Sequence, residues 1–353
     1  MRAVVPVSTA PATAGVAPIR GRARHRSAST TSSTSRVPRA SATESEHVST
    51  PTGPCPSRRG VLAAPLVAAA ASAATGGSMF VPPRARAEEA RVLLVSSSGA
   101  ADAGSAEPFP SVTAALEALA ARRPRGSPAS ILLSPGVYAE RVVVPDSLAR
   151  DLVIEPVAGA APGSVTLEHR TSSPYEATVE NRMPAAAGAA TLRRLVVRHA
   201  SPSVVNNYAA FATPGSSLTL EACDVRSDTG SGVAAEGATL AVRNCSIRGC
   251  KTHGVAVYGD LLGEFGSGEI VGCVVADNGG DGVLLRQGAR GDVRGNTITG
   301  NGGVSVELVD VREGTTLRDN VLGTGTGGKK AKPAVRFGGY GEEDVVAENN
   351  RVV

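Results

Sequence analysis

The stretch EIVGCVVADNGGDGVLLRQG, residues 269–288, decides the fold because its pattern recurs along the chain. The pattern is an apolar residue, two variable residues, a Cys or Asn, one variable residue and a second apolar residue. The Cys or Asn stands at 223, 245, 273, 296 and 320, and looser copies centre on Leu195 and Asn350. The spacings are therefore 28, 22, 28, 23, 24 and 30 residues. A period of roughly 20 to 50 residues is typical of a solenoid.

Each copy predicts one coil of three short strands separated by bends. A Gly-rich bend follows the Cys or Asn, as at 277–282, because Gly and Asn adopt positive φ most easily. A Gly-Val-x-Val strand comes next, and this pattern aligns Val304 with Val283 of the preceding coil. Stacked coils place equivalent strands about 4.8 Å apart in parallel, so valines form a continuous core. The sequence therefore predicts an all-β solenoid of parallel strands.

The Cys and Asn residues of the repeat are expected to form one interior column. Asn296 and Asn320 would stack at a bend and bond to their neighbours through their amides. Cysteines in the same column would act as small buried apolar residues. Metal binding needs clustered His or close Cys pairs, and only Cys245 and Cys250 come near each other. We therefore predict no metal and no cofactor; a disulfide involving Cys250 is an alternative in an oxidising compartment.

Charge is divided unevenly along the 353 residues. Residues 1–87 hold 11 of the 36 Lys and Arg residues but two of the 32 acidic ones, which leaves 25 basic and 30 acidic residues in the remainder. The part of the chain after residue 87 is therefore mildly acidic and lacks the basic surface that phosphate binding requires, so no nucleic-acid partner is expected. Aromatic residues make up 3% of the chain, which suits a stacked array filled with small aliphatic side chains.

The first 87 residues are predicted to be targeting segments. Residues 1–43, with seven Arg and no acid, have the composition of a plastid transit peptide. Residues 44–87 resemble a twin-arginine export signal, with Arg58 and Arg59, an apolar run, and an A-x-A cleavage signal at Ala85 and Ala87. The apolar run is short and Ala-rich, so a permanent membrane span is not expected.

Together these two segments resemble the two-part targeting sequence of a thylakoid-lumen protein. Two alternatives stay open: an exported bacterial protein with a long leader, and an Ala-rich leader with a chance Arg pair. Residues 88–353 are the predicted mature domain.

The entry to the solenoid is predicted to be a strand at 91–95 and a helix at 112–121 that begins after Ser111. The helix is the expected cap of the open end, which would otherwise pair with other chains. Further short strands are predicted at 131–133, 137–144, 152–154 and 165–167.

This entry segment resembles right-handed parallel β-helix proteins of the pectin lyase-like superfamily. The similarity lies in FPSV at 109–112, opening a helix, and in ILLSPGVYAERVVV at 131–144. PGVYAE within it is similar to pectin methylesterases and to β-helix modules of F-box proteins. The repeats after residue 218 resemble the parallel β-helix repeat of carbohydrate-binding and sugar-hydrolase modules. The resemblance implies a right-handed parallel β-helix with an N-terminal capping helix.

One outward column of the Gly-Val-x-Val strands carries the candidate ligand-binding residues. Alternation along these strands points every second side chain outward. An aromatic ring beside carboxylates and a guanidinium suits a sugar chain, because the ring stacks on a sugar face and the charged groups bind hydroxyls. The alternative is a solvated face with offsetting charges. The column is predicted to contain Glu236, Tyr258, Arg286 and Glu307.

Three further polar residues fall on bends that border this face: His253, Asp260 and Asp281. Asp260 is a further ligand-binding candidate, and Asp281 and His253 are the catalytic candidates. The superfamily's complete catalytic sets are missing; the Asn-Thr-Asp of polygalacturonases, for example, is replaced at 296–298 by Asn-Thr-Ile. We therefore predict a lumenal β-helix that binds a polysaccharide or a protein along its strand face. The alternative is a carbohydrate-active enzyme (a lyase, hydrolase or epimerase) with an atypical site that acts on an acidic polysaccharide.

Overall fold

The structure is a computed structural model. It describes residues 91–96, 108–121, 127–202, 207–259, 265–328 and 332–353, all within one compact unit, Met79–Val353. Five of the candidate residues lie outside the described residues: Arg58, Arg59, Ala85, Ala87 and Asp260.

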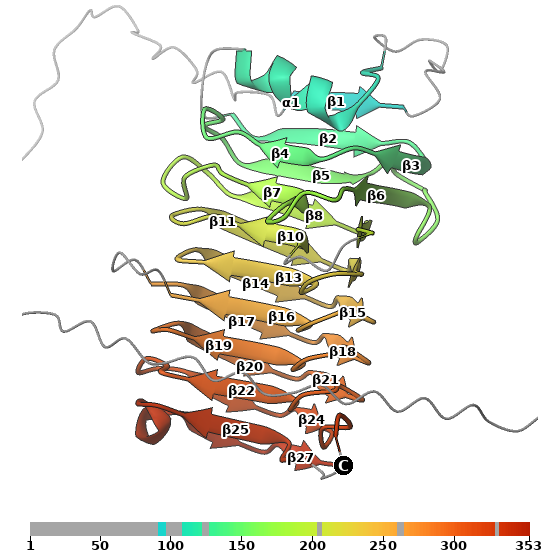
Figure 1. Ribbon diagram of the computed structural model, residues 1–353. Coiled ribbons are helices and arrows are strands. Elements are labelled where there is room, and N and C mark those ends of the chain that lie inside the picture. The colour runs from blue at the N-terminus through green and yellow to red at the C-terminus, as the bar shows by residue number, and fades with distance from the viewer. Residues whose placement is uncertain (1–90, 97–107, 122–126, 203–206, 260–264, 329–331) are drawn as a thin grey trace, which may run out of the picture. The chain divides into compact units, whose positions relative to one another are not determined.

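The described strands form three parallel sheets, which we name A, B and C (Figure 1). Sheet A contains β1 (Arg91–Val95), β2 (Ala129–Leu133), β5 (Leu152–Pro156), β8 (Ala190–Arg193), β11 (Ser217–Glu221), β14 (Thr239–Arg243), β17 (Ser267–Val271), β20 (Arg290–Arg294), β23 (Thr316–Arg318) and β26 (Val346–Glu348). Sheet B contains β3 (Gly136–Ala139), β6 (Val165–Arg170), β9 (Val196–Ala200), β12 (Asp224–Ser227), β15 (Ser246–Arg248), β18 (Val274–Ala276), β21 (Thr297–Thr299), β24 (Val321–Leu322) and β27 (Arg351–Val352). Sheet C contains β4 (Val142–Val144), β7 (Ala177–Asn181), β10 (Tyr208–Ala212), β13 (Val233–Glu236), β16 (Val255–Tyr258), β19 (Val283–Arg286), β22 (Val306–Val309) and β25 (Val335–Gly338).

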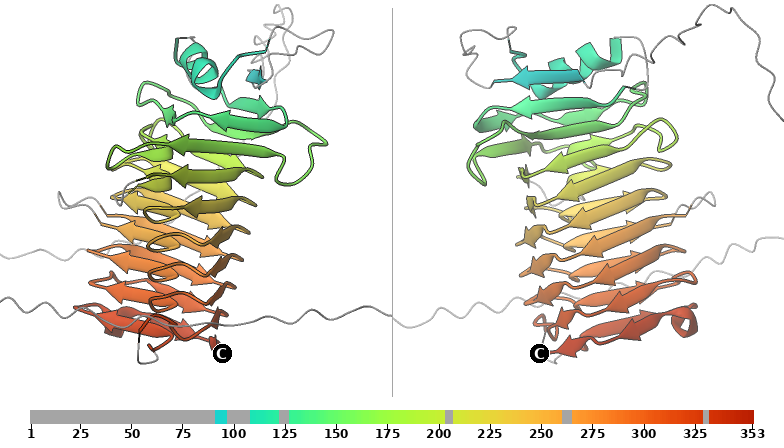
Figure 2. Two further views of the ribbon diagram at one scale, coloured as in Figure 1. Left: turned by 45° about the vertical axis from the view of Figure 1, so that its right-hand side comes forward. Right: turned by 180° about the vertical axis from the view of Figure 1, so that it is seen from behind.

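The chain passes from sheet A to sheet B to sheet C and back to sheet A, so each circuit is one coil. Strands of successive coils pair in parallel in every sheet, and the coils stack along a single axis (Figure 2). Inward-facing aliphatic side chains such as Val233, Val255 and Val283 lie in register and are fully buried. The predicted all-β solenoid of parallel strands is confirmed.

The corner between sheets A and B holds the predicted interior column. The Asn320 Oδ1 accepts from the Asn296 backbone N at 2.9 Å and from its Nδ2 at 3.0 Å, and Asn350 does the same for Asn320. In the earlier coils a thiol replaces the amide, since the Cys245 Sγ accepts from the Cys223 backbone N at 3.4 Å. The Asn ladder and the buried cysteines are therefore confirmed.

The cysteines of the described residues, all free and buried, are Cys223, Cys245, Cys250 and Cys273.

A second ladder, which the sequence analysis missed, stands five residues after the first. The Asn278 Oδ1 accepts from the Cys250 backbone N at 2.9 Å, and the Asn301 Oδ1 accepts from the Asn278 backbone N at 3.1 Å and from its Nδ2 at 2.9 Å. Its members were visible in the sequence as a Cys or Asn at a constant offset from the first column. Side-chain hydrogen bonds therefore hold the bend from sheet B toward sheet C in the same way as the corner between sheets A and B.

The register of β22 corrects the predicted alignment. Val283 pairs with Val306, not with Val304, so Glu307 lies beside Leu284 and not in the column of Arg286. The Val that starts the sheet C strand stands ten residues after Cys223, Cys245, Cys273 and Asn296 alike. The hydrogen bonds of the ladders fix this ten-residue distance. The Gly-Val dipeptide that ends at Val304, two residues earlier, does not change it.

The predicted helix is present with its predicted bounds, α1 (Val112–Ala121), and it contacts β1, β2 and β4 at one end of the stack (Figure 1). Ser111 caps it, because the Ser111 Oγ accepts from the Ala114 backbone N at 3.0 Å. The Glu140 carboxylate accepts from the backbone N of Val112 at 2.8 Å and of Thr113 at 3.0 Å. This carboxylate ties the cap to the first coil. No helix of the described residues is long and apolar enough to cross a membrane.

The single strand predicted over 137–144 is wrong. It is divided into β3 and β4, because Glu140 and Arg141 form the corner between sheets B and C. The Glu140 side chain turns to α1, and the Arg141 side chain turns to Glu176 and Glu180, at 3.2 and 2.6 Å. Near the far end, a short 3-10 helix, η1 (Glu342–Asp344), precedes β26.

The two-residue turn before the first ladder gives a stability prediction. The turn residue has positive φ in each coil; it is Ala222 (52°) in one and Gly295 (66°) in another. A left-handed residue other than Gly costs about 1–2 kcal/mol, against about 0.5–1 kcal/mol for the extra chain entropy of Gly. Ala222→Gly should therefore raise the free energy of unfolding by about 0.5–1 kcal/mol.

The matched change, Gly295→Ala, should lower the free energy of unfolding by a similar amount, because its Cβ would meet no atom within 4 Å and only the backbone is strained. Urea unfolding of both variants is the measurement. Shifts in the same direction would contradict this account of the turn.

Candidate functional site

Three of the predicted residues lie side by side on the outer face of sheet C. Glu236 pairs with Tyr258, and Tyr258 pairs with Arg286, on adjacent strands β13, β16 and β19. Burial is the main cause that raises the pKa of Tyr258, and Glu236 raises it further while Arg286 lowers it. This part of the predicted column is confirmed. Val309 follows Arg286 in it, and Glu307 belongs to the neighbouring outward column.

The two catalytic candidates are in contact. The His253 Nδ1 lies 3.1 Å from the Asp281 Oδ2. It also lies 3.1 Å from the Asp281 backbone N, so a protonated Nδ1 donates to the carboxylate and an unprotonated one accepts from the backbone. The Asp281 Oδ1 accepts from the Val304 backbone N at 2.8 Å. Asp281 is 5% exposed and is thus held on both oxygens.

Glu307 completes this cluster from the next coil. Its Oε1 accepts from the Arg336 Nε at 2.9 Å and from the second guanidinium nitrogen at 2.5 Å. Burial first, and then the hydrogen bond with Asp281, raise the pKa of Glu307, against the effect of Arg336. Burial would raise the pKa of Asp281 too, but hydrogen bonds with His253, Glu307 and Val304 hold it well below its usual range. Their interaction thus moves the two pKa values in opposite directions, that of Asp281 down and that of Glu307 up.

The spacing of this carboxyl pair limits its chemistry. Two carboxyl groups whose pKa values are pushed apart can act as base and acid. Glycosidases, however, hold their two carboxyl groups about 5–9.5 Å apart, to leave room for the sugar and, in inverting enzymes, for water. Asp281 and Glu307 are hydrogen-bonded to each other, which is closer than that. As they stand, they do not flank a glycosidic bond.

An apolar platform, which the sequence analysis missed, lies on the same face. Ala234, Ala256 and Leu284 point outward from sheet C and are nevertheless buried, and the rings of Tyr208, Phe211 and Tyr258 pack against them. The Tyr208 and Phe211 rings stack with centroids 5.1 Å apart. Burial, and to a smaller degree Tyr258 and Glu236, raise the pKa of Tyr208 to about 12. These aromatics were detectable as a cluster of rings in a chain that has few.

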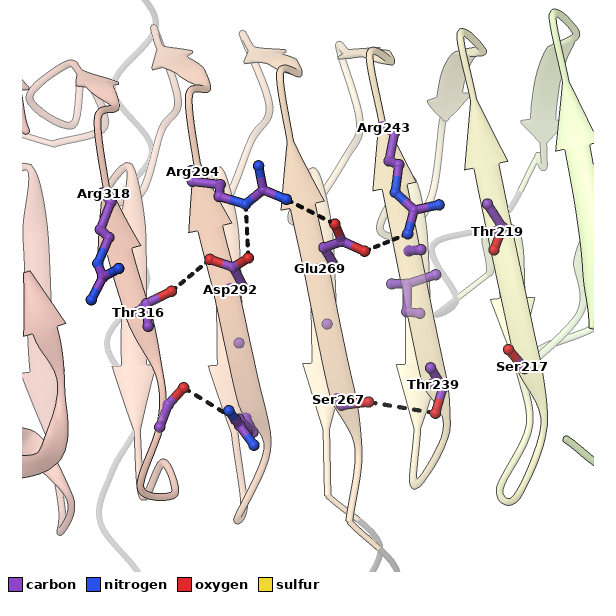
Figure 3. A pocket seen from close by; sticks show the side chains of 16 residues that line it. Ser217, Thr219, Thr239, Arg243, Ser267, Glu269, Asp292, Arg294, Thr316 and Arg318 are labelled. Atoms are coloured by element: carbon purple, nitrogen blue, oxygen red, sulfur yellow. Dashed lines mark hydrogen bonds and ion pairs between the residues drawn. The ribbon is translucent and has the colours of Figure 1, made fainter.

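A second surface feature is a groove of about 710 Å³ on the outer face of sheet A (Figure 3). Its lining contains hydroxyl and charged side chains, and most of the charged ones pair with one another. Arg294 lies 2.9 Å from Asp292 and 3.1 Å from Glu269, and Glu269 also pairs with Arg243. The hydroxyls in the groove belong to Ser217, Thr219, Thr239, Ser267 and Thr316.

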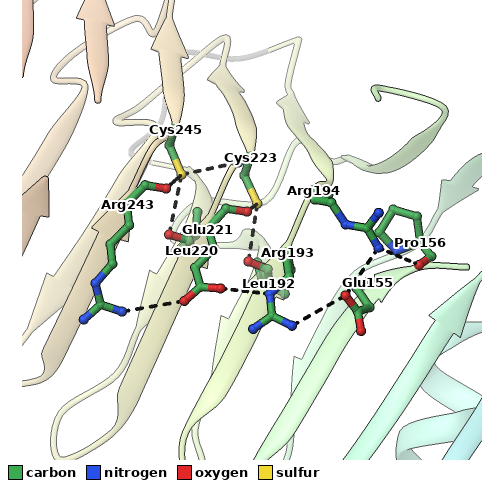
Figure 4. A network of polar contacts seen from close by, with 10 residues as sticks. All are labelled: Glu155, Pro156, Leu192, Arg193, Arg194, Leu220, Glu221, Cys223, Arg243 and Cys245. Carbon is green, nitrogen blue, oxygen red and sulfur yellow. Dashed lines mark hydrogen bonds and ion pairs between the residues drawn. The ribbon is translucent and has the colours of Figure 1, made fainter. Parts of the chain in front are cut away.

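The ion pairs continue along sheet A as a ladder of alternating charge (Figure 4). Arg193 lies 3.6 Å from Glu155 and 2.8 Å from Glu221, and Glu221 lies 3.7 Å from Arg243. Each guanidinium is thus shared between acids of the coils before and after it. Most of these charges satisfy one another, so the groove offers a ligand its hydroxyl groups and the guanidinium of Arg290, which donates to the Gly314 carbonyl at 3.1 Å. Among the described residues, no group of three or more His, Cys, Asp or Glu side chains is arranged to hold a metal ion.

The comparisons with known proteins concern the fold. The family model described as "Right handed beta helix region" matches residues 187–322. The deglycosylated pectin methylesterase from Aspergillus niger is 15% identical, with a TM-score of 0.50 over 75% of this chain and 88% of that one. The chain folds as a right-handed parallel β-helix.

The pectin methylesterase of the rice weevil is a more distant match to this β-helix, 11% identical with a TM-score of 0.44 over 78% of this chain and 92% of that one. A search of curated proteins gave no match. At these identities the likeness concerns the fold and not the chemistry.

Two histidines lie together where the β-helix turns from sheet B toward sheet C. His169 and His199 are in register on β6 and β9, with ring centroids 5.8 Å apart. The His169 Nε2 lies 3.0 Å from the Glu176 Oε2, whose pKa the histidine lowers. His199 is 1% exposed; its Nδ1 lies 3.3 Å from the Thr178 Oγ1. Burial, and then His169, lower the pKa of His199 to about 4.

This buried imidazole predicts acid sensitivity. The folded pKa of His199, about 4, lies below the ordinary value of 6.5, so its neutral form stabilises the fold fully above pH 6.5 and this stability is lost as pH falls toward 4. Between pH 6.5 and 4.5, the loss that comes from His199 should be about 2–3 kcal/mol. Urea unfolding across this range should show a flatter pH dependence for His199→Gln. The same slope in the variant and the parent chain would refute this role of His199.

Proposed function

We propose that this protein binds a polysaccharide along the outer face of sheet C. The observation that carries the proposal is the apolar platform of Tyr208, Phe211 and Tyr258, directly beside the polar row that runs through Glu236 and Arg286. Sugars have one C–H face that packs on aromatic rings and a rim of hydroxyls that pairs with charged groups. A face that combines the two suits this chemistry better than the paired charges of sheet A.

Binding is favoured over hydrolysis by the carboxyl pair. Asp281 and Glu307 are bonded to each other and braced by His253 and Arg336, so a glycosidic bond has no place between them. In a binding face, the same pair offers carboxyl oxygens to sugar hydroxyls. An enzyme remains the second candidate, because a substrate that separated the two groups would release an acid and a base with different pKa values.

The choice of first ligand follows from the fold. The Aspergillus niger protein with this fold is a pectin methylesterase, so fully methyl-esterified pectin heads the ligand panel, with xylan and starch as further neutral members. The folded full chain should be retarded by at least one of these in affinity gel electrophoresis.

Tyr258→Ala and Arg286→Ala should each weaken binding about tenfold, which corresponds to about 1.4 kcal/mol for one lost stacking or charged contact. Arg351→Ala, exposed on β27 of sheet B, is the matched control and should bind as the parent chain does. Retention on no polysaccharide would overturn the proposal in favour of a protein partner. Release of reducing sugar or unsaturated product would instead establish the enzyme.

We also propose that the protein acts in the thylakoid lumen, since the arginine-rich 1–43 and the twin arginines with the A-x-A signal in 44–87 suit that route. Import of the full chain into isolated plastids, followed by N-terminal sequencing, should give a lumenal product that starts at Glu88. Replacing Arg58 and Arg59 by Lys should leave the chain in the stroma, whereas Arg84→Lys should not. Lumenal delivery without the arginine pair would contradict this proposal.

A further inference from the structure

Three successive strands of sheet B carry arginines in one outward column, which begins beside Glu168 of β6, in register with Arg198. Arg198 on β9 pairs with Arg226 on β12, and the pairing of Val225 with Ile247 places Arg248 of β15 next in line. All three arginine side chains are exposed. Neighbouring parallel strands lie about 4.8 Å apart, so three guanidinium groups leave the same face at about that interval.

This arrangement is unfavourable in the protein alone. Like charges directly opposite on adjacent strands destabilise a sheet. On sheet A, Glu221 stands between Arg193 and Arg243, and the directly opposite Arg294 and Arg318 each have acidic partners. The arginines of sheet B have fewer acidic partners, so this face can gain from an added anion.

The guanidinium groups keep free hydrogen-bond donors. Arg198 forms no ion pair or side-chain hydrogen bond with any described residue. Arg226 uses its Nε for Asp228, two residues further in its own coil, at 3.0 Å. Arg248 uses its Nε for Ser246 at 3.2 Å and lies 4.0 Å from Asp277. Since each guanidinium carries five N–H donors, most of them point to solvent.

The column lies in a groove that also holds acids. A hollow of about 520 Å³ is lined by the three arginines together with Arg170, Glu168, Asp224 and Asp228. A second hollow of about 580 Å³ continues it past Arg226 to Lys251 and Asp277. The arginines are aligned along the axis of the β-helix. Glu168 stands at the start of this line, and the other acids flank it.

The combination of arginines and acids in this groove determines which ligand can bind. A chain that carries an anion on each unit matches the aligned cations, and hydroxyl groups on the same units pair with the flanking carboxylates. A nucleic acid has only phosphates along its backbone, which Asp224 and Asp228 would repel. We infer that the face of sheet B formed by Arg198, Arg226 and Arg248 is a binding site for an anionic polysaccharide. This site is separate from the proposed face on sheet C.

The test is binding of the folded full chain to polygalacturonate, dextran sulfate, neutral dextran and single-stranded DNA, by biolayer interferometry at several salt concentrations. The two anionic polysaccharides should bind, neutral dextran should not, and affinity should fall as salt rises. The tighter of the two identifies the anion as carboxylate or sulfate. Arg198→Ala and Arg226→Ala should each weaken this binding five- to tenfold, and the double change should abolish it.

Three further variants test whether the arginines of sheet B form the binding site. Arg198→Lys keeps the charge without the planar donors and should retain part of the affinity. Arg318→Ala, on sheet A, is the matched control and should bind as the parent chain does. Tyr258→Ala should leave polyanion binding on sheet B intact, which separates this site from the one on sheet C. Anion binding that survives the double arginine change, or equal binding of DNA, would overturn the inference.

Discussion

The side-chain ladders at the corners of the coil are the interaction on which the rest of this β-helix depends. A corner interrupts the sheet and leaves backbone N–H groups without a strand partner in the core. An amide from the next coil accepts from this N–H, as Asn320 does for Asn296, and donates to a carbonyl of the coil before, as the Asn320 Nδ2 does to the Val293 carbonyl at 2.9 Å. An unpaired buried donor would cost about 1–3 kcal/mol, so each coil can settle on its neighbour in one register only.

That register decides what each face of the molecule presents. On sheet A it brings opposite charges together, and the result is a ladder of ion pairs from Glu155 to Arg294 (Figures 3 and 4). On sheet C it collects aromatic rings and a carboxyl pair, and on sheet B it aligns arginines. One repeat thus builds three chemically different surfaces, because only the inward positions are constrained by packing and the outward ones are free to diverge.

The features that the repeat encodes could be predicted from the sequence. The solenoid, the ladder of Asn296 and Asn320, the buried cysteines and the capping helix all follow from spacing and residue type. The alignment of β22 failed, because a Gly-Val dipeptide is a weaker determinant than the distance to Asn296. The contacts of Asp281 with His253 and Glu307 were not predictable, because they join residues of three coils whose bends differ in detail. The single strand predicted over 137–144 failed because Glu140 and Arg141 are drawn to opposite partners.

The burial of the cysteines determines how the protein responds to oxidising and reducing conditions. The side chains of Cys223, Cys245, Cys250 and Cys273 are at most 2% exposed, and burial raises the pKa of Cys250 to about 12. These sulfur atoms therefore lie within the hydrocarbon interior, where oxidants and other thiols do not reach them. A β-helix built in this way is covalently the same molecule on the reducing and on the oxidising side of a membrane.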